Sequence, residues 1–322
     1  MGSSFRAHIR TAMKAAFGLL LIALLVRRVD VGAIKSALGL YTWSWLLAAT
    51  TIMVASWPIA ALRWRIFVPS VPLRRLLELT LIGQFYSIVL PGQLAGELAK
   101  AYRLAKGRAE AEKLAASVVA DRIIGMIALL LVAGLGMAYS SSRLPATVAW
   151  IFVGMTLALT ICMFITRAAP VYALVTRSIS RLEGTRLRVL ASSLHRAVAA
   201  WHDFAGTPRR LFASLALGLV FQALGVLMVA MLGANLGIAL PLADWAWIVG
   251  VMSLAVLLPI TIGGIGLREG ALIGCLGFAG VASATAIALS FGIFAVTLFG
   301  ALAGGAVEFA ELRKQSRGIE HG

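Results

Sequence analysis

Long apolar runs recur along the chain and are separated by short segments that are rich in lysine and arginine. A helix needs roughly 20 mostly apolar residues to cross a bilayer. Runs of or near this length lie at residues 12–27, 42–62, 114–139, 147–166, 211–232 and 282–305. The 322 residues are 61% hydrophobic and only 13% charged, a balance that a water-soluble core could not accommodate. The pattern predicts an all-α polytopic membrane protein with six spanning helices.

Two further apolar runs are interrupted by proline and glycine. Residues 77–90 stop at Pro91 and Gly92, and residues 245–258 stop at Pro259; each run then resumes as a short apolar stretch. We expect two broken re-entrant helical hairpins, because irregular backbone at membrane depth is tolerated only inside protein or beside a watery cavity. The alternative is that the two prolines merely kink long spans.

Basic segments predict the topology. Cytoplasmic loops collect lysine and arginine, and this explains the net charge of +16 better than binding to nucleic acid does. Segments 63–75 and 100–113 are both basic, and a hairpin between them keeps both on the cytoplasmic side. The basic connector 167–210 is predicted to be cytoplasmic as well, with an amphipathic helix on the membrane surface. Both termini then lie in the cytoplasm, and the weakly basic outer loops indicate a bacterial inner membrane.

The order of elements is the same in two parts of the chain. Residues 1–140 and residues 141–322 each read as span, span, broken hairpin, span, with opposite starting sides. We therefore predict two membrane units related as an inverted-topology repeat, an arrangement in which interrupted segments mark the binding site. Interfacial tryptophans are expected to form an outer aromatic belt at Trp43, Trp45, Trp150, Trp245 and Trp247.

Charged residues at membrane depth are costly and therefore indicate either function or a structural ion pair. Glu97, Lys100 and Arg103 follow the first break and share one broad helical face, because they are spaced three apart. Free amides at the start of that helix attract phosphate, and the two cations would add direct charge. This segment is therefore a candidate phosphate site.

The remaining deep charges are expected to pair with one another. Because adjacent residues on a helix do not face each other, Arg268 and Glu269 should find partners elsewhere. We expect Arg122 to meet Glu97 or Glu269, and Asp121 to meet Arg268. The alternative is that these pairs are purely structural and lock the two halves together.

Glycines after the second break supply the rest of the candidate site. Gly263, Gly264 and Gly266 allow the backbone to turn and to approach a ligand closely. Tight helix packing by small residues is an equally good explanation for them. The histidines and cysteines show no metal-ligand spacing and no P-loop is present, so we expect no metal, no cofactor and no ATP hydrolysis.

Three motifs, met in order along the chain, carry a family resemblance. Residues 90–104 read LPGQLAGELAKAYRL and resemble the first motif of the lysylphosphatidylglycerol synthase transmembrane (flippase-like) family. Asp121 and Arg122 stand where that family has an acidic–arginine pair in the next span. Residues 258–270 read LPITIGGIGLREG and look like its C-terminal motif. The resemblance covers roughly residues 10–312.

The resemblance implies that the protein moves lipid between leaflets. The chain ends at Gly322 with no soluble aminoacyl-transferase domain, so lysyl transfer is not expected of it. A flippase or scramblase for a phospholipid, or for a polyprenyl-linked or glycosylated lipid, is the leading hypothesis. The expected translocation residues are Pro91, Gly92, Gly96, Glu97, Lys100, Arg103, Asp121, Arg122, Pro259, Gly263, Gly264, Gly266, Arg268 and Glu269.

Two other functions are open at this point. One is a membrane-embedded lipid-modifying enzyme, although the sequence contains no catalytic constellation and we do not expect enzymatic activity. The other is a non-transporting scaffold of an envelope lipid assembly complex. The expected partners are membrane lipids with an anionic or phosphate-bearing headgroup, a separate lipid-synthesising enzyme and a second copy of the chain; nucleic acid is not among them.

Overall fold

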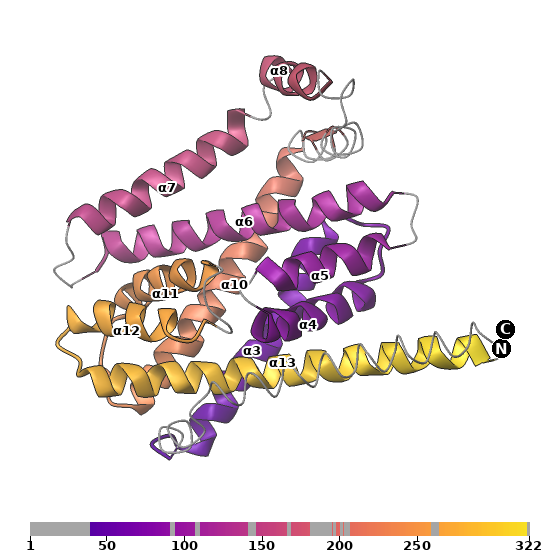
Figure 1. Cartoon of the computed structure of the whole chain (residues 1–322). Helices are drawn as coiled ribbons and strands as arrows, with labels where there is room; N and C mark the ends of the chain where they lie inside the picture. The colour runs from indigo at the N-terminus through magenta and orange to yellow at the C-terminus, as the bar shows by residue number, and fades with distance from the viewer. Residues whose placement is uncertain are drawn as a thin grey trace.

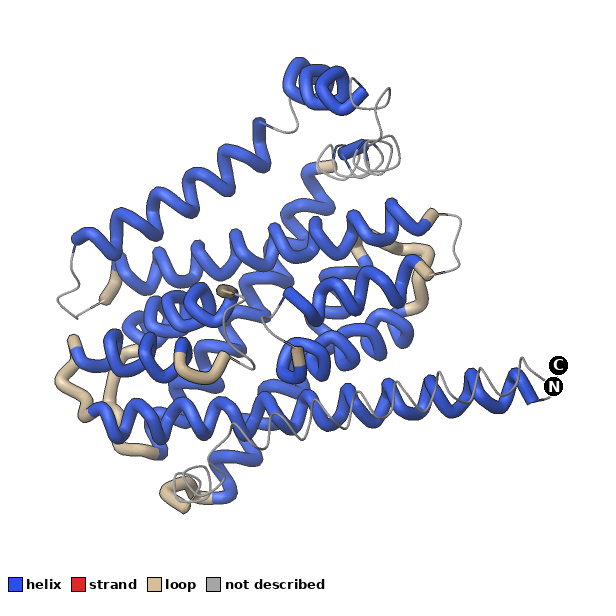
Figure 2. The backbone as a smooth tube through the Cα atoms, in the orientation of Figure 1, coloured by secondary structure: helices blue, strands red, loops and turns tan. Residues whose placement is uncertain are grey.

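The computed structural model describes most of the chain beyond its N-terminal segment. The described residues are 39–90, 94–106, 110–140, 146–165, 169–180, 195, 198, 199, 202, 207–258 and 264–320. Within them every regular element is a helix (Figures 1 and 2). The predicted span at residues 12–27 lies outside the described residues.

The helices follow the predicted runs closely. Their bounds are α3 (Trp43–Arg65), α4 (Leu73–Val89), α5 (Leu94–Ala105), α6 (Ala111–Ala138), α7 (Ala146–Ile165), α8 (Ala169–Ser180), α10 (Pro208–Asn235), α11 (Leu242–Leu257), α12 (Leu267–Gly277) and α13 (Ser283–Glu320). Long uninterrupted apolar runs form helices here because a helix satisfies all of its own backbone hydrogen bonds.

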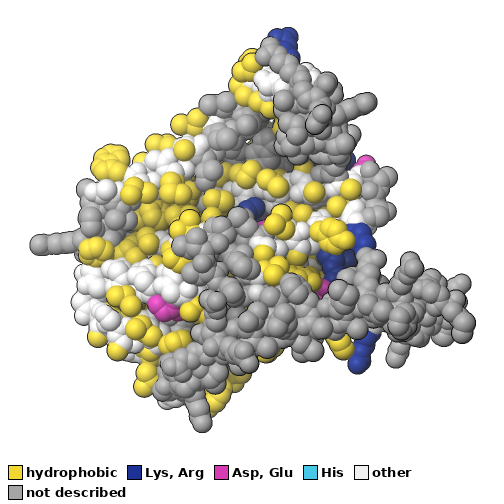
Figure 3. All heavy atoms as spheres, viewed as in Figure 1, with side chains coloured by type: hydrophobic (Ala, Val, Ile, Leu, Met, Phe, Trp, Pro, Cys, Tyr) yellow, Lys and Arg dark blue, Asp and Glu magenta, His cyan; other side chains and the backbone are white. Residues whose placement is uncertain are grey.

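Some of these helices could cross a membrane. Within the described residues, four are long and apolar enough by length and composition, at Trp43–Arg65, Lys113–Ala138, Pro208–Asn235 and Ser283–Arg313. They coincide with four of the six predicted spans, and α7 occupies a fifth with 20 residues. Large apolar side chains also remain exposed, and Figure 3 shows hydrophobic side chains across the middle of the visible face. Such a surface suits lipid better than water.

Each interrupted run folds into two helices that pack side by side. The first run ends with α4 at Val89 and resumes as α5 at Leu94, and these two helices pack against each other. The second run gives α11, which ends at Leu257, and α12, which begins at Leu267 and packs against α11. A long span with a simple kink would not bring the two helices together in this way. The breaking residues themselves lie outside the described residues: Pro91, Gly92, Pro259 and Gly263.

The last long helix of each part of the chain packs against a broken helix pair of the other part. The last long helix of the first part, α6, packs against α11, and the last long helix of the second part, α13, packs against α4 (Figure 1). The helices α3 and α10 pack against each other between them. Each broken helix pair is therefore held by a long helix from the other part of the chain.

The core corrects one expectation about the tryptophans. Trp43 and Trp150 are exposed, but Trp245 and Trp247 are each only 1% exposed. The indole of Trp245 packs where a side chain at Gly233 would stand, and the Trp247 indole nitrogen donates to Asp244 at 3.3 Å. The prediction that Trp245 and Trp247 belong to an interfacial belt is wrong, because α11 is buried among its neighbours.

Candidate functional site

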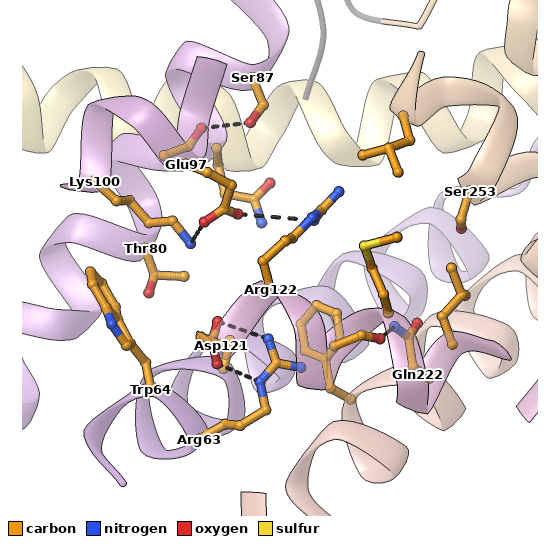
Figure 4. A pocket seen from close by; sticks show the side chains of 18 of the residues that line it. Arg63, Trp64, Thr80, Ser87, Glu97, Lys100, Asp121, Arg122, Gln222 and Ser253 are labelled. Carbon is orange, nitrogen blue, oxygen red and sulfur yellow. Dashed lines mark hydrogen bonds and ion pairs between the residues drawn. The ribbon is translucent and has the colours of Figure 1, made fainter. Parts of the chain in front are cut away.

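A polar cavity of about 300 Å³ lies among α3, α4, α5, α6, α10 and α11 (Figure 4). Its wall contains both charged and aromatic side chains, which come from helices far apart in the sequence. The polar and aromatic lining residues used below are Trp57, Arg63, Trp64, Glu97, Lys100, Asp121, Arg122, Phe221, Gln222 and Ser253. Ionisable side chains in such apolar helices are costly unless they are paired, and those of the cavity wall form the ion pairs described below.

Arg63 and Asp121 form a two-pronged ion pair at the base of the cavity. Arg63 Nε donates to Asp121 Oδ1 at 2.7 Å, and Nη2 donates to Oδ2 at 3.0 Å. The two side chains are only 8% and 9% exposed, and the guanidinium carbon lies 5.5 Å from the centre of the Phe221 ring. The prediction that Asp121 meets Arg268 is wrong, since α6 lies against α3 and α10 at this point. The sequence predicts a basic loop that begins at Arg63, but Arg63 is buried in the last turn of α3.

Glu97 is the centre of a second, looser set of ion pairs. Its Oε2 lies 2.7 Å from Lys100 Nζ, one turn further along α5, and its Oε1 lies 3.9 Å from Arg122 Nη1. Of the two partners predicted for Arg122, Glu97 and Glu269, the structure confirms Glu97. The side chains of Arg122 and Glu97 are 31% and 22% exposed, so this contact is more accessible than the pair below it. Lys100 Nζ also lies over the Trp64 ring, 5.2 Å from its centre.

Asp121 and Arg122 are consecutive on α6 but serve different neighbours. Adjacent helical residues point about 100° apart. Asp121 therefore reaches α3, whereas Arg122 extends toward Glu97 on α5 (Figure 4). Two consecutive residues of α6 thus link it to two different helices, α3 through Asp121 and α5 through Arg122.

Several polar atoms of the cavity wall are buried without a hydrogen-bond partner. They are Trp57 Nε1, Arg63 Nη1 and Arg122 Nε, all of which are donors. Glu97 Oε2 also lacks a hydrogen bond of good angle, but its close contact with Lys100 Nζ compensates its charge. Buried polar groups in proteins are nearly always satisfied, so these three donors are available to an acceptor that occupies the cavity.

Arg103 points away from this cavity, although it shares a helix with Glu97 and Lys100. It donates to Glu311 Oε2 at 3.1 Å and also to Glu308, both on α13. Glu308 accepts a further hydrogen bond from the Tyr86 hydroxyl at 3.0 Å. The structure therefore places Arg103 in a contact between α5 and α13, and it does not bring Arg103 together with Lys100 as one phosphate site.

Arg268 and Glu269 form a separate cluster at the start of α12. Arg268 Nε donates to Ser290 Oγ at 2.7 Å, and its Nη2 lies 3.4 Å from Glu269 Oε1. The Ser290 hydroxyl also donates to Glu269, while the Gly266 backbone N–H donates to the other oxygen of that carboxylate. The expectation that Arg268 and Glu269 cannot meet is wrong, because both belong to the first turn and the carboxylate curls back to cap it. Neither residue lines the cavity.

The candidate glycines have packing and backbone roles. A side chain at Gly96 would clash with the Gly83 carbonyl oxygen and the Ser87 hydroxyl, so Gly96 allows α5 to lie close against α4. Gly264 and Gly266 have φ angles of 74° and 90°, which residues with a side chain rarely adopt. Gly96 therefore has a packing role that the sequence does not predict, whereas Gly264 and Gly266 have the predicted turning role.

A comparison with protein families identifies the chain. The model of the lysylphosphatidylglycerol synthase transmembrane region matches residues 11–305. The chain belongs to this family. The resemblance of the three motifs is therefore confirmed, and the protein is a multi-pass membrane protein with a lipid-related function. No curated protein matches the sequence.

Two cavity residues of this family member carry no sequence signal that would assign them to a functional site. Arg63 looks like part of a basic loop, because the charge pattern does not show that α3 continues to Arg65. Trp57 lies within an apolar run and carries no local signal of an unpaired donor. Gln222, whose amide donates to the Gly125 carbonyl oxygen at 3.1 Å, does carry a sequence signal, because it is a polar side chain near the middle of the apolar run 211–232.

Proposed function

We propose that this protein is a flippase or scramblase that moves a phosphate-bearing lipid between the leaflets of a bacterial inner membrane. The observation that carries the proposal is a charged cavity enclosed by helices that are apolar enough to span a membrane. A lipid headgroup crosses hydrocarbon only at great cost, and a polar site at membrane depth lowers that cost. The acyl chains would remain in the bilayer while the headgroup occupies the cavity.

We propose that an inverted repeat with six spans and two re-entrant hairpins is the architecture that serves this function. Exchanging α3 with α10, α4 with α11, α5 with α12 and α6 with α13 leaves the pattern of contacts among these eight helices unchanged. The cavity wall draws on helices of both units, as expected for a site at a repeat interface. The basic ends of α5 and α13 lie on the same side of the molecule, at the right of Figure 1, and we propose that this side faces the cytoplasm. The proposal from the charge pattern of the sequence is that both termini are cytoplasmic as well.

The two ion-pair systems have different roles in this proposal. The buried Arg63–Asp121 pair holds α6 against α3 throughout. The Arg122–Glu97 contact is longer and more exposed, so an entering phosphate competes with Glu97 for the Arg122 guanidinium. Loss of that contact frees α5 from α6, and movement of the broken helix pair opens a path for the headgroup.

Transport is preferred to catalysis because both cavity carboxylates are engaged by cations. Asp121 and Glu97 are each paired, which leaves neither as an obvious general base or nucleophile. A scaffold would have no need for a charged cavity with unsatisfied donors. The proposed partners are accordingly membrane lipids, with a lipid-synthesising enzyme as the source of the substrate.

Leaflet exchange of fluorescent phospholipids in proteoliposomes tests the function, with dithionite quenching as the readout. Wild-type protein should expose inner-leaflet lipid to dithionite, and Arg122→Gln should abolish this exchange. Arg74→Gln is a matched control, because the Arg74 side chain is 86% exposed and lies outside the cavity. Absence of exchange with zwitterionic, anionic and polyprenyl-phosphate lipids alike would reject transport and favour a scaffold or an enzyme.

A further inference from the structure

We infer that the cavity selects a compact, net anionic headgroup and discriminates against a cationic, aminoacylated one. The inference rests on the proposed function, since it names the class of lipid that the same cavity would accept. It depends on three properties of the described lining residues: their charge, the kind of hydrogen-bonding group left unsatisfied, and the size of the space.

The charge of the lining favours an anion. Arg63, Lys100 and Arg122 stand against Glu97 and Asp121, so the ionised side chains carry one net positive charge. Both oxygens of Asp121 accept hydrogen bonds from Arg63. The Glu97 carboxylate lies between Lys100 and Arg122. An ammonium group entering the cavity would therefore meet no free carboxylate.

Apart from Glu97 Oε2, whose charge is compensated by Lys100 Nζ at 2.7 Å, the cavity atoms without a hydrogen-bond partner are donors. Trp57 Nε1 is a donor only, and so are Arg63 Nη1 and Arg122 Nε. Phosphate oxygens accept several hydrogen bonds at once and would satisfy these groups. An ammonium offers three more donors and no acceptor, so it would leave every one of them unsatisfied and add its own desolvation cost.

The donors are also held in place before any ligand arrives. The two hydrogen bonds to Asp121 fix the Arg63 guanidinium, whose remaining nitrogen, Nη1, carries no partner. A group that is fixed beforehand loses little freedom on binding, which strengthens the contact it makes. Trp57 is buried in α3 and is likewise constrained by its surroundings.

The volume limits the headgroup. A cavity of about 300 Å³ is at the small end of ligand pockets. A phosphate with a small polyol fits that space, whereas an oligosaccharide does not. The net positive charge of the lining and the small volume of the cavity together favour a simple anionic phospholipid. Large glycosylated headgroups do not fit the cavity in this conformation of the protein.

Lipid binding to the full-length protein in detergent tests the inference, with native mass spectrometry as the readout. The probes are phosphatidylglycerol, phosphatidylethanolamine and lysyl-phosphatidylglycerol of identical acyl chains, with inorganic phosphate and glycerol phosphate as soluble competitors. Phosphatidylglycerol should bind at least about tenfold more tightly than its lysylated form, in keeping with one unfavourable charge contact.

Trp57→Phe should weaken phosphatidylglycerol binding by about tenfold, the effect of losing one hydrogen bond to a charged acceptor. Trp45→Phe is the control, because Trp45 is an exposed tryptophan on the same helix and outside the cavity.

The outcomes separate this inference from the proposed function. Lipid exchange without preference among the three headgroups would overturn the selectivity and leave transport standing. Preferential binding of phosphatidylglycerol without exchange would support the anionic site and reject transport. Equal binding of the lysylated lipid, or no effect of Trp57→Phe, would overturn the inference. Competition by inorganic phosphate as strong as that by lipid would overturn it too, since the site would then recognise a free anion.

Discussion

Arg63 on α3 and Asp121 on α6 share two hydrogen bonds, at 2.7 and 3.0 Å, in the most deeply buried ion pair of the cavity wall. Two-pronged pairing between guanidinium and carboxylate is geometrically specific. Burial makes such a pair costly to form, but the loss of one partner costs more, because the other charge is left uncompensated. The pair therefore fixes the position of α6 and, with it, the direction in which Arg122 points.

Removal of the Asp121 charge should destabilise the protein. Asp121→Asn leaves Arg63 buried without its counter-charge and should lower the free energy of unfolding by about 3–5 kcal/mol. Thermal unfolding of the detergent-solubilised protein measures the effect, and Glu110→Gln serves as the control because the Glu110 side chain is 66% exposed. The double variant Arg63→Met, Asp121→Leu should recover much of the loss. An unchanged melting temperature in Asp121→Asn would argue against a locking role for the pair.

Neutralisation of Glu97 should separate binding from transport. Glu97→Gln releases Arg122 and Lys100 and raises the net positive charge of the cavity by one. Anionic lipid should then bind more tightly, by about tenfold, whereas exchange between leaflets should slow because release is impaired. Native mass spectrometry measures the first quantity and dithionite quenching the second. A parallel loss of both would instead indicate that Glu97 holds the cavity in shape.

The close packing of α5 on α4 predicts sensitivity at Gly96. Gly96→Ala introduces a methyl group against the Gly83 carbonyl and the Ser87 hydroxyl, and should destabilise the protein by about 1–3 kcal/mol. Gly274→Ala is the matched control on α12, where a side chain would meet nothing within 4 Å. That substitution should be neutral or stabilising, by up to about 1 kcal/mol, because alanine favours helix. Similar melting temperatures for the two variants would contradict the packing role.

Arg103 should affect the attachment of α5 without affecting ligand affinity. Arg103→Gln removes the contacts with Glu308 and Glu311, so hydrogen exchange of backbone amides in α5 and along residues 306–313 should rise several-fold. Phosphatidylglycerol affinity should stay within about twofold of wild type, because Arg103 does not line the cavity. If Arg103→Gln weakens binding as much as Arg122→Gln does, Arg103 belongs to the binding site after all.

The sequence and the structure agree best where the signal is local. The apolar run at 114–139 became α6, Ala111–Ala138, and the run at 211–232 became α10, Pro208–Asn235. The interruption after residue 90 separates two helices, as the Pro91-Gly92 pair predicts. Hydrophobicity and helix breaking act over a few residues, so they can be judged from the chain alone. The contact between Glu97 and Arg122 is predictable because few charged residues lie at membrane depth and each needs a partner.

The sequence by itself determined that this chain is a helical membrane protein, where its apolar runs lie, and which motifs place it in its family. Tertiary structure alone decided that Arg63 pairs with Asp121, that Arg268 closes on Glu269 and Ser290, and that Trp245 and Trp247 lie in the core. The physical reason is that a helix leaves its rotation and its neighbours undetermined. Those are settled by the close packing of many side chains at once, and the cavity exists only where that packing brings α3, α5 and α6 together.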